Sequence, residues 1–305
     1  MIGVPKICTQ DNWRFTDHSR IYYFSWFLLF KIVKHESSLL ETLAAIILRM
    51  IQFLLIMILG WMNGIFINYL SDVLPSHRKI TVPTCPSCNR RIPIRSYLFW
   101  PRRCPSCGQA RSIRVWVVEL SAIVITLWLW YNPSPTLDFI FGYLLVTYLG
   151  TVFVIDIEHH LILHPVSIVG AVLCLGIGIG LRGFPKTLLG GLGGLGIMMV
   201  LYLFGILFSR SMMRWKKRDI EPEGMGFGDV ILSGVLGLLL GWPGITFGLT
   251  LGIIAAGLFT ALYLLIAMAT RRYRSFGTIP YGPFLIIGAI LPLFFRDELI
   301  AILGT

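Results

Sequence analysis

Long apolar segments separated by short polar ones occupy most of the chain. Most of them are close to the roughly 20 residues that an α-helix needs to cross the hydrocarbon core of a bilayer. The pattern predicts eight membrane-spanning helices, at residues 44–69, 115–131, 137–155, 165–181, 187–208, 230–240, 245–270 and 283–303. The sixth is short. We therefore expect either that Asp229, which precedes it, lies partly in the membrane or that this helix begins earlier.

An extension of 43 residues precedes these spans. Its apolar run, residues 21–33, is short for a crossing and contains several aromatic side chains and Lys31. These features favour a helix that lies in the membrane interface, with a first crossing as the alternative. The polar stretch before the run and the lack of a small-residue cleavage site after it argue against a cleavable signal peptide.

Basic residues gather in three of the predicted loops, 75–114, 210–218 and 271–274. With eight spans these loops all fall on one side of the membrane, and an excess of Lys and Arg is typical of the cytoplasmic side. The same topology places Asp156, which follows the third span, and Asp229 at that face. We expect four parts: the extension 1–43, a first transmembrane helix within 44–74, a cytoplasmic loop domain 75–114 and a seven-helix core 115–305.

The composition agrees with a membrane protein. Of the 305 residues 56% are hydrophobic and only 13% are charged, a balance with which a water-soluble domain would precipitate. The predicted fold class is therefore an all-α polytopic membrane protein embedded in the lipid bilayer. The net charge of +11 is explained by membrane orientation, and no motif for nucleic-acid recognition accompanies it.

Two carboxylates at one membrane face suggest acid–base chemistry. Charge at the end of a membrane helix is costly, and such residues usually face a protein interior or a watery cavity and serve a function. When two carboxylates are close, repulsion raises one pKa, so that a base and an acid occur at one site. Such a pair can activate water against a peptide carbonyl. The alternative is structural: Asp156 would face water, and Asp229 would cap the helix that follows it.

Four of the six cysteines form two CPSC motifs, Cys85 with Cys88 and Cys104 with Cys107. Their spacing matches a four-thiolate zinc site, which would stabilise a loop that has too little core to fold alone. Two disulfides or a redox dithiol are the alternatives, but a cytoplasmic location disfavours stable disulfides. A complete thiolate shell leaves no position for water, so we expect the zinc to be structural.

Glycine-rich stretches also occur inside the spans. The segment 190–196 is GGLGGLG and lacks the Lys-Ser/Thr pair that follows in a phosphate-binding loop. We therefore expect its glycines to allow close helix packing, as we do for Gly248 and Gly252.

Six short motifs follow one another in a fixed order. They are GIFIN at 64–68 with LP at 74–75, the paired cysteines, SIR at 112–114 with VEL at 118–120, IDIEH at 155–159, GFGDV at 226–230 and IPYGPF at 279–284. From about Gly64 to the C-terminus the chain thus resembles the bacterial prepilin peptidases, also called type IV leader peptidases. The resemblance implies an intramembrane aspartic peptidase with Asp156 and Asp229 as the catalytic pair, and with Gly226 and Gly228 as glycines of the second motif.

The resemblance further implies a substrate and a second activity. The substrates would be type IV prepilins or the related pseudopilins of secretion systems, cleaved after a short basic leader at the cytoplasmic face of the inner membrane. Members with the cysteine loop also methylate the new N-terminus with S-adenosylmethionine. Because the Arg-rich loops suit a basic leader poorly, we expect acids to bind it: Glu119, Glu158, Glu221 and Glu223. For Glu119 a pairing with a loop arginine is the alternative, and for Glu158 exposure to solvent.

The chain departs from the family pattern at two places. Leu163-His164 stands where the family has a Pro-Asp pair, and Ile231 stands where it has a lysine. These departures leave open an inactive scaffold of a pilus or secretion assembly. Independently of them, the intramembrane acids would also suit a proton- or cation-coupled transporter, which gives no reason for the cysteine loop.

Overall fold

The computed structural model describes residues 18–85, 87–98, 102–134, 137–216, 226–270 and 280–295. Within these ranges the chain is helical, apart from loops and two isolated β-bridges, Thr84 with Arg91 and Arg103 with Ala110. The prediction of an all-α protein is therefore confirmed. The helices are α1 (His18–His77), α2 (Ile94–Leu98), α3 (Ile113–Tyr131), α4 (Phe139–His159), α5 (His164–Arg182), α6 (Phe184–Lys216), α7 (Phe227–Leu240), α8 (Gly244–Ala269) and α9 (Gly282–Phe294).

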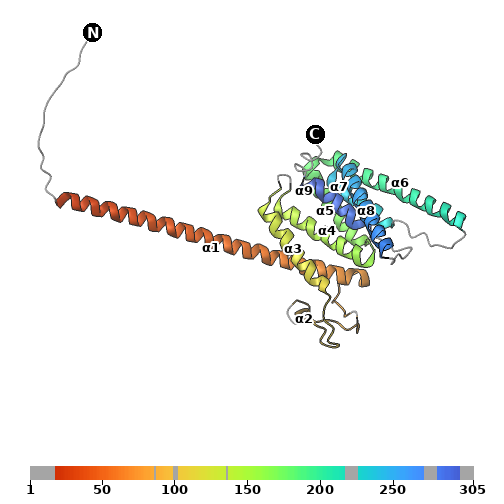
Figure 1. Cartoon of the computed structure of the whole chain (residues 1–305), viewed down its shortest axis with the longest axis horizontal. Coiled ribbons are helices and arrows are strands. Elements are labelled where there is room, and N and C mark those ends of the chain that lie inside the picture. The colour runs from red at the N-terminus through yellow and green to blue at the C-terminus, as the bar shows by residue number, and fades with distance from the viewer. Residues whose placement is uncertain are drawn as a thin grey trace, which may run out of the picture. The chain divides into compact units, whose positions relative to one another are not determined.

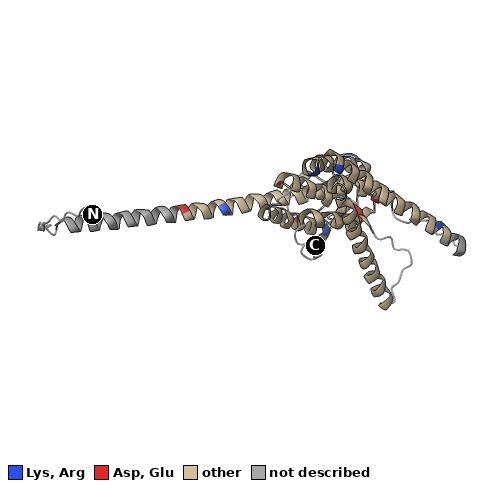
Figure 2. Ribbon diagram, turned by 90° about the horizontal axis from the view of Figure 1, so that it is seen from above, with Lys and Arg blue, Asp and Glu red and all other residues tan. Residues whose placement is uncertain are grey.

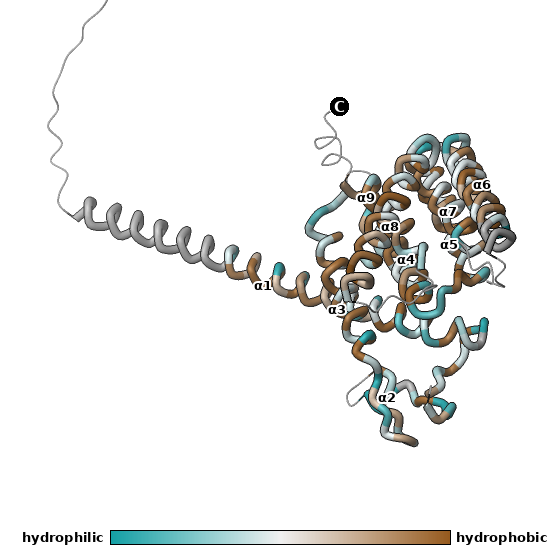
Figure 3. The backbone as a smooth tube through the Cα atoms, turned by 45° about the vertical axis from the view of Figure 1, so that its right-hand side comes forward, coloured by the Kyte–Doolittle hydropathy of each residue, from teal (hydrophilic) through white to brown (hydrophobic). Residues whose placement is uncertain are grey.

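Six helices in the described part of the chain are long and apolar enough to cross a membrane: α1 over Glu41–Ser76, α3, α4, α5, α6 over Phe184–Phe208, and α8. Two shorter apolar helices, α7 and α9, complete the eight segments predicted from the hydropathy pattern. Figure 3 shows hydrophobic residues along these helices and hydrophilic ones in the loop around α2. Charged residues are sparse on the helices (Figure 2). Large apolar side chains stay exposed, as Leu258 of α8 does at 68%, which suits a lipid environment.

The chain divides into two compact units, Met1–Leu55 and Ile56–Thr305, and α1 begins in the first and ends in the second. The hydropathy pattern predicts separate helices at residues 21–33 and 44–69, whereas α1 continues without a break through both. No Gly or Pro interrupts the helix between them, so nothing in the sequence ends a helix there. The division of the chain into four functional parts stays a prediction.

Helix α7 is the most enclosed helix of the second unit. Ten of its 14 residues are buried, and it packs against α5, α6, α8 and α9 (Figure 1). It begins at Phe227, before the predicted start at residue 230, so Asp229 lies inside its first turn. The hydrophobic core of this unit centres on α7 and includes Leu232, Leu236 and Leu239, all at most 1% exposed.

Glycines allow α6 and α7 to approach each other at backbone distance. A Cβ added at Gly190 would lie 2.4 Å from the carbonyl oxygen of Gly237, and one at Gly194 would lie 2.3 Å from that of Ser233. The hydroxyl of Ser233 donates to the carbonyl oxygen of Gly194 at 3.1 Å. The glycines of 190–196 thus serve helix packing, as predicted, and Gly248 does the same between α8 and α9.

Candidate active site

Asp156 lies in the last turn of α4, and its side chain points into the protein. The helix ends at His160, which adopts a left-handed conformation and donates its backbone N–H to the carbonyl oxygen of Asp156 at 3.0 Å. The residue is only 4% exposed, and its Oδ2 accepts no hydrogen bond from the part of the chain that the structure describes. Because so little of Asp156 is exposed, its side chain does not face water, as the structural alternative would require.

Asp229 lies in the first turn of α7 and is 7% exposed. The N-cap of this helix is Gly226, and the backbone N–H of Asp229 donates to the Gly226 carbonyl oxygen at 3.0 Å. The Gly226 amide faces the Asp229 carboxylate, as in a capping box. A capping role for Asp229 is therefore part of the observed geometry, but it leaves the carboxylate in a buried position close to a second acid.

The two carboxylates are close enough for their charges to interact. Neither of them forms an ion pair with a lysine or arginine among the described residues, whose ion pairs involve other acids. Two helix ends that are 73 positions apart in sequence thus bring two acids to one buried place, as the sequence analysis predicts for their membrane face.

The start of α9 forms a third side of this site. The backbone amide of Gly282 faces the carboxylate of Asp156, and the side chain of Tyr281 interacts with the charge of Asp229. A Cβ added at Gly282 would lie 2.5 Å from Oδ2 of Asp156, so any larger residue would displace the carboxylate. Both residues belong to the motif IPYGPF, whose pattern alone predicts no role for either of them.

The two glycines of the second motif have different tasks. A Cβ at Gly228 would lie 2.8 Å from the Cβ of Ile162, in the loop between α4 and α5, so this glycine allows the start of α7 to approach that loop. Gly226 is exposed, and a Cβ there would meet no atom closer than 3.8 Å. A close contact thus requires glycine at 228, whereas at Gly226 neither a contact nor the extended backbone of the N-cap does.

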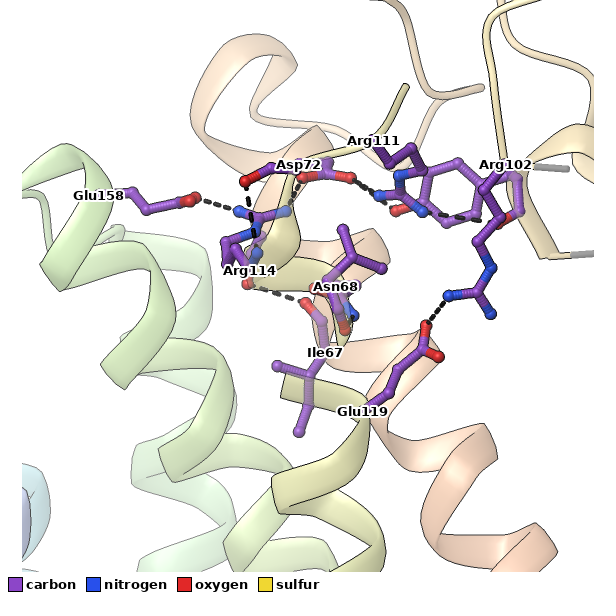
Figure 4. A network of polar contacts seen from close by, with 12 residues as sticks. Ile67, Asn68, Asp72, Arg102, Arg111, Arg114, Glu119 and Glu158 are labelled. Atoms are coloured by element: carbon purple, nitrogen blue, oxygen red, sulfur yellow. Dashed lines mark hydrogen bonds and ion pairs between the residues drawn. The ribbon is translucent and has the colours of Figure 1, made fainter. Parts of the chain in front are cut away.

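Two of the acids expected to bind a basic leader are paired with arginines. Glu119 accepts hydrogen bonds from Arg102 at 2.7 Å and from the indole of Trp61 at 3.0 Å, and both charged side chains are 5% exposed. Its pairing with a loop arginine, the alternative of the sequence analysis, is what the structure shows (Figure 4). Glu158 pairs with Arg114. The other two acids of that set, Glu221 and Glu223, lie outside the described residues.

The four loop cysteines form one cluster. Their sulfur atoms all lie within 4.8 Å of one another, with 3.6 Å between Cys85 and Cys107 and 3.7 Å between Cys88 and Cys104. Four thiolates at about 2.3 Å from a tetrahedral metal ion would be about 3.8 Å apart, so the cluster fits such an ion. These separations are too long for disulfides, and all four cysteines are free.

Backbone amides favour the thiolate form of the first cysteine in each CPSC turn, whereas desolvation and hydrogen bonding from the other sulfur atoms raise the pKa of Cys107 to about 12. The N–H groups of Ser106 and Cys107 donate to the sulfur of Cys104 and lower its pKa to about 6. Those of Cys88 and Ser87 lower the pKa of Cys85 in the same way. Each CPSC turn thus stabilises its first cysteine as the thiolate that a metal ion requires.

Comparison with known proteins identifies a family for the chain. The model of the "Type IV leader peptidase family" matches residues 143–266, and that of the "Bacterial Peptidase A24 N-terminal domain" matches residues 58–132. Together they cover nearly two thirds of the chain. The chain belongs to the type IV leader peptidase family. It is thus a member of a family of membrane peptidases, and the resemblance stated from the six motifs is confirmed.

Curated relatives cover most of the chain. A protein of Aeromonas salmonicida (strain A449) is 28% identical over 221 residues, which make up 70% of this chain and 72% of the relative. One of Legionella pneumophila is 28% identical over 71% and 73%, and one of Pseudomonas aeruginosa is 29% identical over 70% and 72%. All three are named prepilin leader peptidase/N-methyltransferase. No solved structure matches the chain.

The two departures from the family pattern meet in space. His164 is the first residue of α5, and Ile231 lies half a turn beyond Asp229 in α7. Both line one cavity of about 400 Å³ between α5, α6 and α7, whose other lining residues are apolar apart from Ser167. The departures therefore lie together at one cavity, whose lining includes neither Asp156 nor Asp229.

Proposed function

We propose that this protein is an aspartic endopeptidase that removes the basic leader from type IV prepilins or pseudopilins. The observation that carries the proposal is the meeting of Asp156 and Asp229, two buried carboxylates that interact with each other and with no described lysine or arginine. Membership of the leader peptidase family supports the substrate class, because its relatives carry prepilin processing in their names.

The mechanism requires one proton shared between the two acids. The ionised carboxylate takes a proton from a water molecule as its oxygen attacks the scissile carbonyl carbon, and the protonated carboxyl donates its proton to the carbonyl oxygen. The tetrahedral intermediate collapses when the C–N bond breaks and the leaving amine takes a proton from the site. No covalent bond to the enzyme forms, and we assign no order of roles to Asp156 and Asp229.

The proposed location is the cytoplasmic face of the inner membrane. Arg114 at the start of α3 pairs with Glu158 at the end of α4, so Asp156 lies at the same end of the second unit as the basic loop 75–114. Because lysine and arginine are enriched on the cytoplasmic side, this end faces the cytoplasm. The prepilin would present its leader there and keep its apolar helix in the bilayer.

The cysteine cluster is proposed to hold a structural zinc ion, with Cys85, Cys88, Cys104 and Cys107 as its ligands. Zinc would close the loop around a very small core and would take no part in hydrolysis, because four thiolates leave no position for water. Methylation of the new N-terminus with S-adenosylmethionine, the second activity in the relatives' names, is proposed as an additional step.

Mass spectrometry of a co-expressed type IV prepilin tests these proposals in one experiment, since the mass reports loss of the leader and the added methyl group separately. We expect processing by the wild type and none by Asp156→Asn or Asp229→Asn. Asp138→Asn is the matched control, because this exposed acid precedes α4 at its other end. Unchanged processing in both active-site variants would refute the proposal and favour a scaffold, and loss of ion flux without any processing would favour a transporter.

A further inference from the structure

One arginine links α4, the helix that carries Asp156, to α1 and α3. Arg114, in the first turn of α3, uses one terminal nitrogen of its guanidinium group for Asp72 of α1 and the other for Glu158 of α4 (Figure 4). Glu158 follows Asp156 by two residues in the last turn of α4. Planar guanidinium is suited to hold two carboxylates in a fixed geometry, which the ammonium of lysine is not.

Asp72 is also bound from the cysteine loop. The hydroxyl of Tyr97 in α2 donates to its Oδ2 at 2.7 Å, and Arg111, four residues after Cys107, pairs with the same oxygen. The guanidinium of Arg111 stacks on the ring of Tyr97, with its Cζ 3.8 Å from the ring centroid. Asp72 therefore receives two of its three partners from the segment that folds around the cysteines.

The ring of Tyr97 belongs to the core of that loop. This core contains four buried residues, Tyr97, Ile92, Cys85 and Cys104, of which the last two are candidate metal ligands. A core of this size cannot hold the loop by apolar burial alone, so the metal ion supplies a large part of its order. Loss of the metal would release Tyr97 and Arg111 and leave Asp72 with Arg114 as its remaining partner.

Arg114 offsets the negative charge of Glu158 at the C-terminus of α4. The C-terminus of a helix carries partial negative charge, so Glu158 is unfavourable in the last turn of α4 unless a cation offsets it. Arg114 supplies that cation and is itself held by Asp72. We infer that Arg114 is a positioning residue that couples the metal-binding loop to the end of α4, and thereby to the placement of Asp156. The inference rests on the proposed function, because it assigns Asp156 a catalytic role.

Zinc affinity is the first test and does not depend on activity. Zinc binding to the full chain in detergent is measured by competition with a chromophoric chelator, for the wild type, Arg114→Gln and Glu158→Gln. We expect both variants to bind zinc at least about fivefold more weakly, the lower end of the usual coupling between sites. Arg95→Gln is the control: Arg95 is exposed on α2 of the same loop and forms no ion pair with any described residue. Its affinity should equal that of the wild type.

Prepilin cleavage with and without zinc is the second test. Removing zinc from the wild type should lower kcat about tenfold and leave KM unchanged, because a shift of less than 1 Å in Asp156 affects chemistry more than binding. In Glu158→Gln kcat should already be reduced, and removing zinc should change it little further. A loss caused by general unfolding would instead change the fraction of folded protein, which thermal unfolding of the same samples reports.

The outcomes separate this inference from the proposed function. If the wild type cleaves prepilin but zinc removal and Glu158→Gln lower kcat by independent factors, or zinc affinity is unchanged in both variants, the coupling is refuted and the peptidase stands. If the wild type cleaves no prepilin, the function is refuted, and the affinity measurement still decides whether Arg114 connects the loop to α4.

Discussion

Replacing Gly282 by alanine probes the catalytic pair without touching either acid. The new Cβ would lie 2.5 Å from Oδ2 and 3.1 Å from Cγ of Asp156, while ordinary contacts begin at 3.4 Å, so the carboxylate must move by about 0.9 Å. The Cδ2 atom of Leu232 lies 3.5 Å from the same Cβ, already in van der Waals contact. A misplacement of about 1 Å costs on the order of 100-fold in rate, so we expect kcat to fall by about two orders of magnitude.

The assay is cleavage of a prepilin in detergent or proteoliposomes, with kcat and KM determined separately. Because a Cβ on the residue before Pro283 also disfavours its helical conformation, thermal unfolding is followed in parallel. Gly257→Ala in α8 is the matched control, since a Cβ there meets no atom within 4 Å, and it should retain wild-type kcat. A folded Gly282→Ala protein with wild-type kcat would refute the placement of Asp156 at the chemistry.

Three further changes test other parts of the structure. Gly228→Ala should lower kcat about tenfold at unchanged zinc content, because its Cβ would press on Ile162 at 2.8 Å and displace the start of α7; an unchanged kcat would contradict this contact. Glu119→Gln leaves the buried Arg102 without its acid, at a cost of about 3–5 kcal/mol, so the unfolding temperature should drop, and an equal temperature would contradict a buried pair. Cys107→Ser should reduce the zinc content, which is expected to be one ion per wild-type chain in elemental analysis; full retention would argue against a four-thiolate site.

Hydropathy and charge were sufficient to predict the apolar helices and the end of the protein at which the two acids lie. Membrane helices satisfy their own backbone hydrogen bonds, so their positions follow from local composition. The exact start of α7 could not be predicted from hydropathy. Gly226 and Gly228 belong to the turn that begins the helix, but glycine adds nothing to an apolar pattern. The continuity of α1 was also missed, since polar residues between two apolar runs do not end a helix.

The partners of charged side chains depend on tertiary contacts that no local pattern contains. Glu119 was expected to pair with a loop arginine or to bind the leader, and which arginine, Arg102, needed the structure; the pairing of Glu158 with Arg114 was not expected. Tyr281 and Gly282 reach the aspartates only because α9 packs beside α4 and α7. The motif IPYGPF marked them, but the steric reason for a glycine at 282 needed the position of Asp156.

The central claim is that Asp156 and Asp229 act as one catalytic unit. Single-turnover cleavage of a prepilin by Asp156→Asn, Asp229→Asn and the double variant measures this most directly. When two residues share one proton, removing either one abolishes the function of both. Each single variant should therefore lose as much activity as the double variant, and all three should stay folded with zinc bound. A single variant that keeps substantial activity, or a double variant slower by the product of the two single effects, would contradict the account.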